Sequence, residues 1–234
     1  MKKSSSRKKQ KIRVAIIGVG NVASVLVQAL CSGKELDGVW HPSIGGYSIR
    51  DMELVAAFDI DNRKVGLDLS EAIFAKPNVS PKFVSVPSIE IVVKPGLVGA
   101  DVPAHLRDST VRSSPVSEAL RDSKADIALL LIPSGMQETC AAYAEETLKA
   151  GVGLVNATPV ILATDRGLSK RFARAKLLLV GDDLMSQFGG TAFHKGILDF
   201  INSRGLKVEK SYQLDVGGGN ETLNTITAAT FDAR

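Results

Sequence analysis

The sequence has few cysteines, no long apolar run and no acidic residue near its start. Only Cys31 and Cys140 occur among 234 residues, and they lack the spacing of metal ligands. We therefore expect two free thiols in the reducing environment of the cytoplasm. No run of 18 apolar residues occurs, so the sequence predicts no transmembrane helix and no membrane partner.

Residues 1–11 form a basic segment that we expect to be disordered. Residues 1–13 hold seven of the 29 Lys and Arg residues and no acid, which leaves 22 basic against 25 acidic residues in the remainder. The segment lacks the apolar stretch of a secretory signal. Such a tail can contact nucleic acid or an anionic membrane, although a solvated leader is the simpler interpretation. The mildly acidic remainder argues against a nucleic-acid groove, so no nucleic acid is expected as a partner.

Short apolar runs alternate with helical segments between residues 12 and 184. Strands are predicted at residues 14–17, 54–58, 127–132, 153–155 and 177–180, and helices at 22–31, 115–123, 136–150 and 165–175. The strands are rich in Ile, Leu and Val throughout, which indicates burial on both faces. Strand–helix alternation then predicts an α/β fold with a Rossmann-like, doubly wound parallel sheet over residues 12–184.

Several stretches do not fit this alternation. Residues 32–51 are predicted to be an ordered insertion, and residues 78–114 to be extended segments or a loop over the sheet edge. Residues 187–203 carry a helical apolar stripe, and residues 207–216 alternate like a strand. A lone helix and strand cannot bury both their faces. We therefore expect residues 185–234 to begin a second, α+β domain, which this chain leaves incomplete.

A glycine-rich loop follows the first predicted strand and opens the first predicted helix. It reads Gly18-Val19-Gly20-Asn21-Val22-Ala23. In a dinucleotide-binding loop the first glycine permits the tight turn, and the second lets the backbone approach a pyrophosphate. The helix N-terminus offers unpaired N–H groups to the anion. This context favours a dinucleotide site over a plain glycine turn.

Asp59 and Asp61 decide the predicted cofactor. They end the second predicted strand, where a carboxylate can accept hydrogen bonds from ribose hydroxyls. Both carboxylates would repel a 2′-phosphate, so NAD is preferred over NADP. The insertion 32–51 explains why Asp59 lies 39 residues beyond Gly20 rather than about 20. A helix-capping aspartate is the alternative interpretation.

Other polar residues follow later strands, at the sheet edge where ligands bind. Ser134 follows the third predicted strand, and Ala157 follows the fourth. Asp182 and Asp183 follow the fifth, where they can bind a cation, orient a sugar hydroxyl or cap a helix. Two carboxylates are too few to name a metal.

Seven stretches together resemble the bacterial and archaeal form of myo-inositol-phosphate synthase. They are residues 14–20 with Asn21, 47–51, 55–61, 64–75, 155–159, 181–183 with Ser186 and Gln187, and 213–218 with Leu223 and Asn224. The stretches 64–75 and 181–187 are the most specific. The resemblance runs in order from about residue 12 to residue 226.

The resemblance implies NAD-dependent isomerisation of glucose 6-phosphate to 1D-myo-inositol 3-phosphate, a step of inositol and phospholipid biosynthesis. NAD would remain bound, because the hydride taken from the sugar is returned to it. The resemblance also implies that residues 185–234 begin the domain for catalysis and oligomerisation, which forms a homotetramer when it is complete. Positions that match NAD-contacting residues are Gly18, Gly20, Asn21, Val22, Asp59, Asp68, Ser134, Tyr143, Ala157 and Ser186.

Departures from the family pattern leave the function of this polypeptide open. Met185 stands where relatives carry a lysine, and the family's lysine-rich catalytic segment is absent. The catalytic residue is therefore unassigned, with candidates Asp182, Asp183, Glu221 and Asn224. Three interpretations remain: a member or fragment of the synthase family, with the activity of this short form left open, an NAD-dependent oxidoreductase acting on a polyol or sugar phosphate, and a non-catalytic NAD-binding paralogue or subunit.

Overall fold

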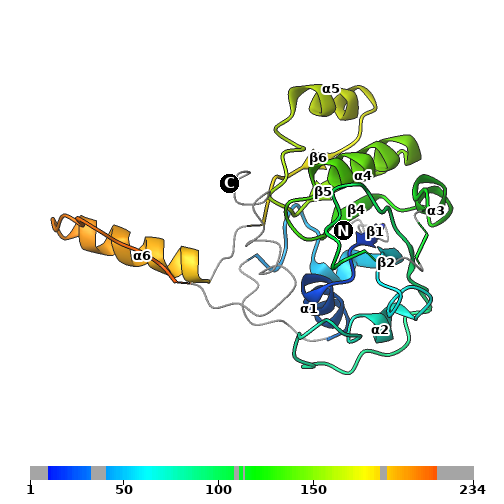
Figure 1. Ribbon diagram of the computed structural model, residues 1–234, viewed down its shortest axis with the longest axis horizontal. Helices are drawn as coiled ribbons and strands as arrows, with labels where there is room; N and C mark the ends of the chain where they lie inside the picture. The colour runs from blue at the N-terminus through cyan, green and yellow to red at the C-terminus, as the bar shows by residue number, and fades with distance from the viewer. Residues whose placement is uncertain (1–9, 33–40, 108–110, 113, 185–188, 215–234) are drawn as a thin grey trace, which may run out of the picture.

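Six parallel strands form one sheet in the order β3-β2-β1-β4-β5-β6 (Figure 1). The computed structural model describes residues 10–32, 41–107, 111–112, 114–184 and 189–214. The strands are β1 (Ile12–Ile17), β2 (Met52–Asp59), β3 (Lys94–Pro95), β4 (Ile127–Leu130), β5 (Gly153–Asn156) and β6 (Leu179–Val180). This is the strand order of the Rossmann fold, so the predicted fold class is confirmed.

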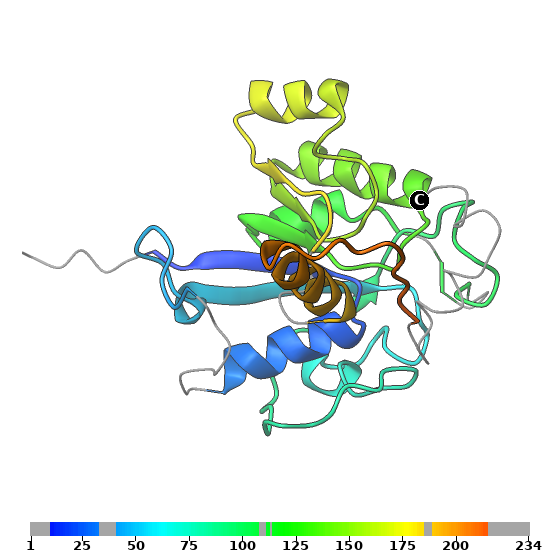
Figure 2. The ribbon, with the colours of Figure 1, turned by 90° about the vertical axis from the view of Figure 1, so that its left-hand side faces the viewer.

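Helices cover both faces of the sheet and make three layers (Figure 2). On one face lie α1 (Asn21–Cys31) and α2 (Leu69–Ala72), and on the other lie α3 (Ser117–Asp122), α4 (Gln137–Ala150) and α5 (Arg166–Arg174). Successive strand residues point to opposite faces. Ala15 and Ile17 of β1 therefore pack with α3 and α4, whereas Ile16 between them packs with α1.

Each strand and helix predicted up to residue 184 forms, with ends shifted by at most two residues. The one-turn helix α2, the 3-10 helix Ile49–Asp51 and the two-residue strand β3 were not predicted, because such short elements carry no periodic pattern. Apart from β3 and a single bridge at Val92, the described residues of 78–114 form neither helix nor strand, as predicted.

The region after residue 184 departs from the prediction. Helix α6 (Gly190–Ser203) forms within the predicted apolar stripe, but residues 207–214 form no strand. No strand of the described chain lies beside them, and an unpaired strand has no ladder of hydrogen bonds to hold it. Residues 215–216 of that predicted strand lie outside the described residues.

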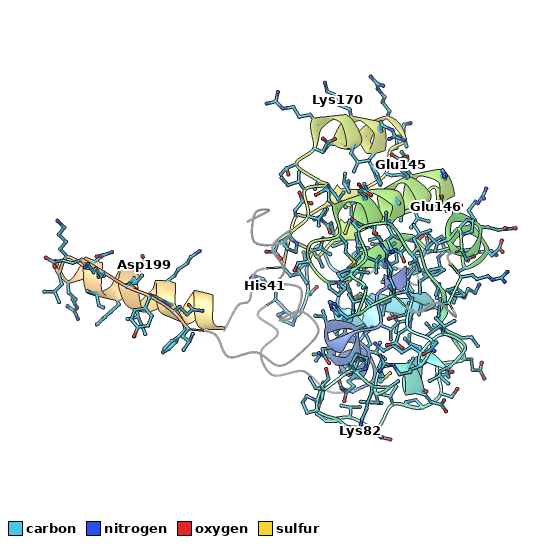
Figure 3. The ribbon with its side chains drawn as sticks, viewed as in Figure 1. His41, Lys82, Glu145, Glu146, Lys170 and Asp199 are labelled. Atoms are coloured by element: carbon cyan, nitrogen blue, oxygen red, sulfur yellow. The ribbon has the colours of Figure 1, made fainter. Side chains whose placement is uncertain are left out.

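Helix α6 projects away from the sheet, and none of its described side chains is buried (Figure 3). Phe193, Ile197 and Phe200 are 58%, 44% and 62% exposed, and Asp199 lies on the same helix. The apolar stripe of a helix normally packs against another element, and no described element covers this one. Among the described helices, none is both long and apolar enough to cross a membrane.

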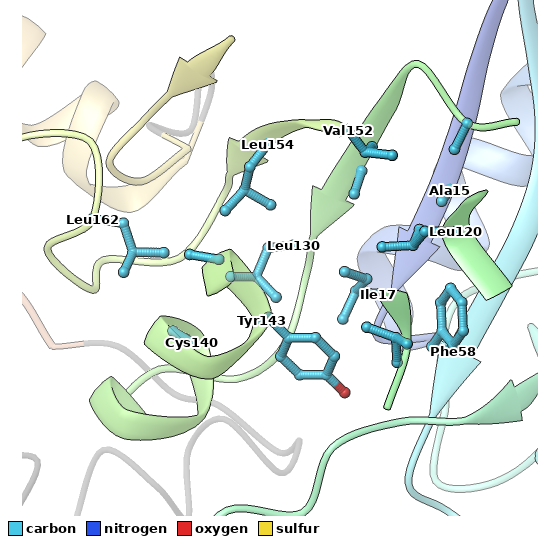
Figure 4. Close-up of a cluster of buried hydrophobic side chains, with 14 of the residues drawn as sticks. Ala15, Ile17, Phe58, Leu120, Leu130, Cys140, Tyr143, Val152, Leu154 and Leu162 are labelled. Atoms are coloured by element: carbon cyan, nitrogen blue, oxygen red, sulfur yellow. The ribbon is translucent and has the colours of Figure 1, made fainter. Parts of the chain in front are cut away.

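The larger of two cores lies between the sheet and α3, α4 and α5 (Figure 4). Leu130, Leu154 and Phe58 of the strands pack there with Leu120 of α3 and Cys140 of α4. All five side chains are at most 1% exposed. This core fixes where β2, β4 and β5 end, and so positions the residues that follow them.

Candidate functional site

A pocket of about 870 Å³ opens at the carboxyl ends of the strands. Its walls are the glycine-rich loop after β1 and the residues that follow β2, β4, β5 and β6. The loop 97–107, which comes after β3, contributes a further wall. The order of the strands reverses between β1 and β4, which is where open α/β sheets bind ligands.

The glycine-rich loop lines this pocket at the start of α1. Gly18 has φ of +96°, and a Cβ there would lie 2.9 Å from the backbone carbonyl of Leu131, so only glycine fits. Gly20 has no atom within 4 Å of where a Cβ would stand. The first turn of α1 has no side-chain cap, and Asn21 and Val22 also line the pocket. Its N–H groups are suited to an anion.

Asp59 lies at the end of β2 and faces the same loop. Its carboxylate accepts hydrogen bonds from the backbone N–H groups of Val19 at 2.7 Å, Ile60 at 2.7 Å and Asp61 at 2.9 Å. A carboxylate has about four acceptor sites, so one remains for a ligand. Asp59 therefore shapes the glycine-rich loop as well as lining the pocket.

Lys64 is a buried cation beneath this loop, only 4% exposed. Its ammonium donates to the carbonyl of Val19 at 2.8 Å and to Oδ1 of Asn78 at 3.0 Å, and lies 3.9 Å from the Asp59 carboxylate. Asn78 donates to the same Val19 carbonyl at 3.1 Å. Sequence reasoning used Lys64 only as part of a motif, because no local pattern shows that a lysine will be buried.

Asp61 and Arg63 form an ion pair at the same end of β2. The guanidinium donates from Nε to Oδ1 at 2.8 Å and from Nη2 to Oδ2 at 2.6 Å. Burial alone would raise the pKa of Asp61, but the hydrogen bonds and charge of Arg63, with Lys64 nearby, lower it. Both residues line the pocket.

The half of the pocket beyond β4 is formed by Ser134, Tyr143 and Ala157. Ser134 is 5% exposed, and its Oγ has no hydrogen-bond partner in the described chain. The Tyr143 hydroxyl accepts a hydrogen bond from the N–H of Leu97 at 2.7 Å, and burial raises its pKa. A buried hydroxyl without a partner is unusual in proteins and indicates a missing ligand or water.

The loop 97–107 is held across the pocket by Asp101. This carboxylate accepts from the N–H groups of Glu138 at 2.6 Å and Thr139 at 3.2 Å, at the start of α4, which has no N-cap side chain of its own. A Cβ at Gly99 would collide with the Thr139 hydroxyl, so the close approach needs glycine. The loop thereby brings His105 and Arg107 into the pocket wall, which sequence reasoning missed.

The two adjacent aspartates after β6 have different surroundings. Asp182 accepts hydrogen bonds from Asn156 at 2.8 Å, from the N–H groups of residues 162–164 at 2.9 to 3.2 Å and from the Thr164 hydroxyl at 2.9 Å. Burial alone would raise its pKa, but these bonds lower it. Asp183 lines the pocket with φ of +78°, a conformation that few non-glycine residues adopt.

Asp182 and Asp183, which the sequence offered together as candidates, therefore have different roles. The Asp182 carboxylate holds the loop 162–164 and does not line the pocket, whereas Asp183 does. The two carboxylates do not form a shared cation site, and no cluster of three potential metal ligands occurs in the described chain.

Asp68 lies outside the pocket lining, unlike the other described cofactor candidates. It is the N-cap of α2 and accepts from the N–H groups of Ser70, Ile89 and Glu90 and from the Ser88 hydroxyl. Burial alone would raise its pKa, but these bonds lower it to about 2. Helix capping thus accounts for this carboxylate. Three further candidates, Ser186, Glu221 and Asn224, lie outside the described residues.

Comparison with known proteins gives the family. The family model described as myo-inositol-1-phosphate synthase matches residues 189–234. Inositol-3-phosphate synthase of Mycolicibacterium smegmatis is 37% identical over 95% of this chain, which spans 64% of the length of that relative. A crystal structure of Ari2 is similar with a TM-score of 0.82 and 34% identity, covering 93% of this chain and 67% of the other.

A myo-inositol-1-phosphate synthase-related protein from Thermotoga maritima, 19% identical over 84% of this chain and 60% of its own, shares the fold with a TM-score of 0.59. The identity to Ari2 and to the Mycolicibacterium enzyme extends along nearly the whole of this chain. The chain therefore belongs to the myo-inositol-phosphate synthase family, as its sequence motifs predicted.

Proposed function

We propose that this chain binds NAD and serves the conversion of glucose 6-phosphate to 1D-myo-inositol 3-phosphate, for inositol and phospholipid synthesis in the cytoplasm. The observation that carries the proposal is the pocket itself. It joins a glycine-rich loop and helix N-terminus to the Ser134 hydroxyl, which has no hydrogen-bond partner among the described residues. Membership of the synthase family supports the substrate and the reaction.

The residues present fit NAD. Gly20 leaves open space where a pyrophosphate needs close approach to the backbone, and the uncapped first turn of α1 offers N–H groups to it. Asp59 keeps one acceptor site for a ribose hydroxyl. At the other end Ser134 can hydrogen-bond a polar group of the ligand, which would satisfy a buried oxygen that no described residue pairs.

Bound NAD would supply a hydride acceptor that returns the hydride later, so the reaction has no net redox change. The chain would bind and orient the reactants around it. Asp183 and Arg107 line the pocket, where the carboxylate can accept hydrogen bonds from sugar hydroxyls and the guanidinium brings a positive charge to a phosphate. The loop 97–107 forms one wall of the pocket and is tied to Tyr143 by the hydrogen bond from the N–H of Leu97.

One observation favours a second function, that of a non-catalytic NAD-binding protein or subunit. Moving the protons of such a reaction, while stabilising its oxyanions, needs a cation that can release a proton, which a lysine does and an arginine does not. Lys64 is the one lysine among the described lining residues, and its ammonium is occupied by Val19, Asn78 and Asp59. The described residues thus support binding more directly than turnover.

We also propose that α6 begins a second domain, after a cofactor-binding domain that ends at residue 184, and that this domain supports a homo-oligomer. The exposed Phe193, Ile197 and Phe200 support this assignment, because an apolar stripe is stable when it is covered.

A titration of NAD into Ser134→Ala tests the proposal. Removing an unpartnered hydroxyl should leave the free energy of unfolding unchanged or slightly higher, because no hydrogen bond of the described chain is lost. NAD affinity should fall about three- to tenfold, the worth of one hydrogen bond. Calorimetry measures the affinity and urea denaturation the stability.

Two outcomes would overturn parts of the proposal. Absence of NAD binding by the wild-type chain would remove the cofactor assignment. Accumulation of NADH with glucose 6-phosphate would favour a net oxidoreductase instead of an isomerase. Inositol phosphate formation without net NADH distinguishes the synthase from a protein that only binds NAD.

A further inference from the structure

We infer that Asp61 sets the choice between NAD and NADP by holding the guanidinium of Arg63 away from the ribose 2′ position. The inference rests on the proposed dinucleotide site. Asp61 and Arg63 directly follow β2, at the strand end where the adenosine ribose lies in Rossmann folds. Both residues line the pocket, next to Asp59 and Lys64.

The charges at this strand end cancel in pairs. Asp59 lies 3.9 Å from Lys64, and Asp61 lies 2.6 Å from Arg63. The repulsion of a 2′-phosphate by two uncompensated carboxylates, which the sequence predicts, is therefore weaker than expected. Charge alone does not explain a preference for NAD.

Arg63 is the residue type that NADP-binding folds use to accept a 2′-phosphate. Here two donors of its planar fork, Nε and Nη2, are directed to the two oxygens of Asp61. The backbone N–H of Arg63 donates to the same carboxylate at 3.0 Å, which holds the Asp61 side chain close to Arg63. To reach the Arg63 guanidinium, a 2′-phosphate would have to displace the Asp61 carboxylate, which already accepts the two hydrogen bonds that a phosphate would accept there.

The pair can be opened without loss of the fold. The Arg63 side chain is 56% exposed and the Asp61 side chain 17% exposed, so water replaces the lost contacts. The carbonyl of Asp61, which accepts from the N–H groups of Lys64 and Val65, is unchanged by a side-chain substitution. We therefore expect Asp61→Asn to fold.

Asp61→Asn tests the inference by titration with NAD and with NADP. The amide removes one negative charge and cannot accept both donors of the fork. NADP affinity should rise at least tenfold relative to the wild type, and NAD affinity should change less than threefold. Asp122→Asn, an exposed substitution on α3, is the matched control and should change neither affinity.

The double variant Asp61→Asn with Arg63→Gln separates the two contributions of Asp61. If Arg63 is the latent phosphate receptor, the gain in NADP affinity disappears in the double variant. A gain that persists there would mean that Asp61 acts only through repulsion, and would overturn the inference.

Arg63→Gln alone gives an independent measurement, should Asp61→Asn fail to fold. It leaves the Asp61 charge uncompensated, so NADP binding should weaken further while NAD binding is kept. Unchanged or tighter NADP binding by this variant would overturn the inference. A wild-type chain that binds neither dinucleotide would instead overturn the proposed function.

Discussion

Replacing Lys64 by Met removes the buried cation that links the glycine-rich loop to Asn78 and Asp59. Three contacts are lost: the bonds to the Val19 carbonyl at 2.8 Å and to Asn78 Oδ1 at 3.0 Å, and the ion pair with Asp59 at 3.9 Å. Met has a similar length and fills the same space, so the change is mainly one of charge and hydrogen bonding.

The expected loss of stability follows from what remains around Asp59. Breaking a buried ion pair by removing one partner destabilises a protein by about 3–5 kcal/mol. Asp59 is 11% exposed and keeps three backbone N–H donors, and Val19 keeps the bond from Asn78, so we expect about 2–4 kcal/mol. NAD affinity should fall as well, because the glycine-rich loop, which we propose to bind the pyrophosphate, loses its anchor.

Urea denaturation and calorimetric titration measure the two effects, with Lys170→Met as the control. Lys170 is exposed on α5 (Figure 3) and does not line the pocket, so its substitution should leave both quantities unchanged. A Lys64→Met variant whose free energy of unfolding lies within 0.5 kcal/mol of the wild type would refute the reasoning, because the smallest expected loss is ~2 kcal/mol.

Two further substitutions test the supports of the pocket. Asp101→Ala removes the carboxylate that caps α4, so we expect about 1–2 kcal/mol of lost stability and weaker NAD binding. Asp101→Asn keeps an acceptor and should recover most of the stability and of the NAD affinity. Equal effects of the Ala and Asn variants would contradict the capping role. Asp68 has a folded-state pKa of about 2, below its ordinary value of 3.8, so its charge stabilises the fold above about pH 4 and this contribution is lost as the pH falls toward 2. Asp68→Asn keeps the helix cap, so urea denaturation should show a deficit of about 1–2 kcal/mol at pH 6 that shrinks at pH 3; a deficit independent of pH would show that the charge is not responsible.

The sequence by itself determined the layered α/β fold. Continuous Ile, Leu and Val runs alternating with amphipathic segments can bury their apolar faces in few other ways, and short elements of this kind have ends that vary by only a residue or two. The glycine-rich loop could also be predicted from the sequence, because Gly18 occupies a backbone conformation and a space that exclude a Cβ. Local chemistry was sufficient for both.

Only the tertiary structure decided which polar residues face the pocket. Asp182 and Asp183 are neighbours in sequence, yet one carboxylate is taken up by the loop 162–164 and the other lines the pocket. Lys64 becomes a buried anchor and Arg63 a partner of Asp61 through contacts that no spacing in the sequence specifies. The predicted strand at 207–216 fails over its described part for the same reason: a strand needs a neighbour, and whether one is present is a property of the fold and not of the segment.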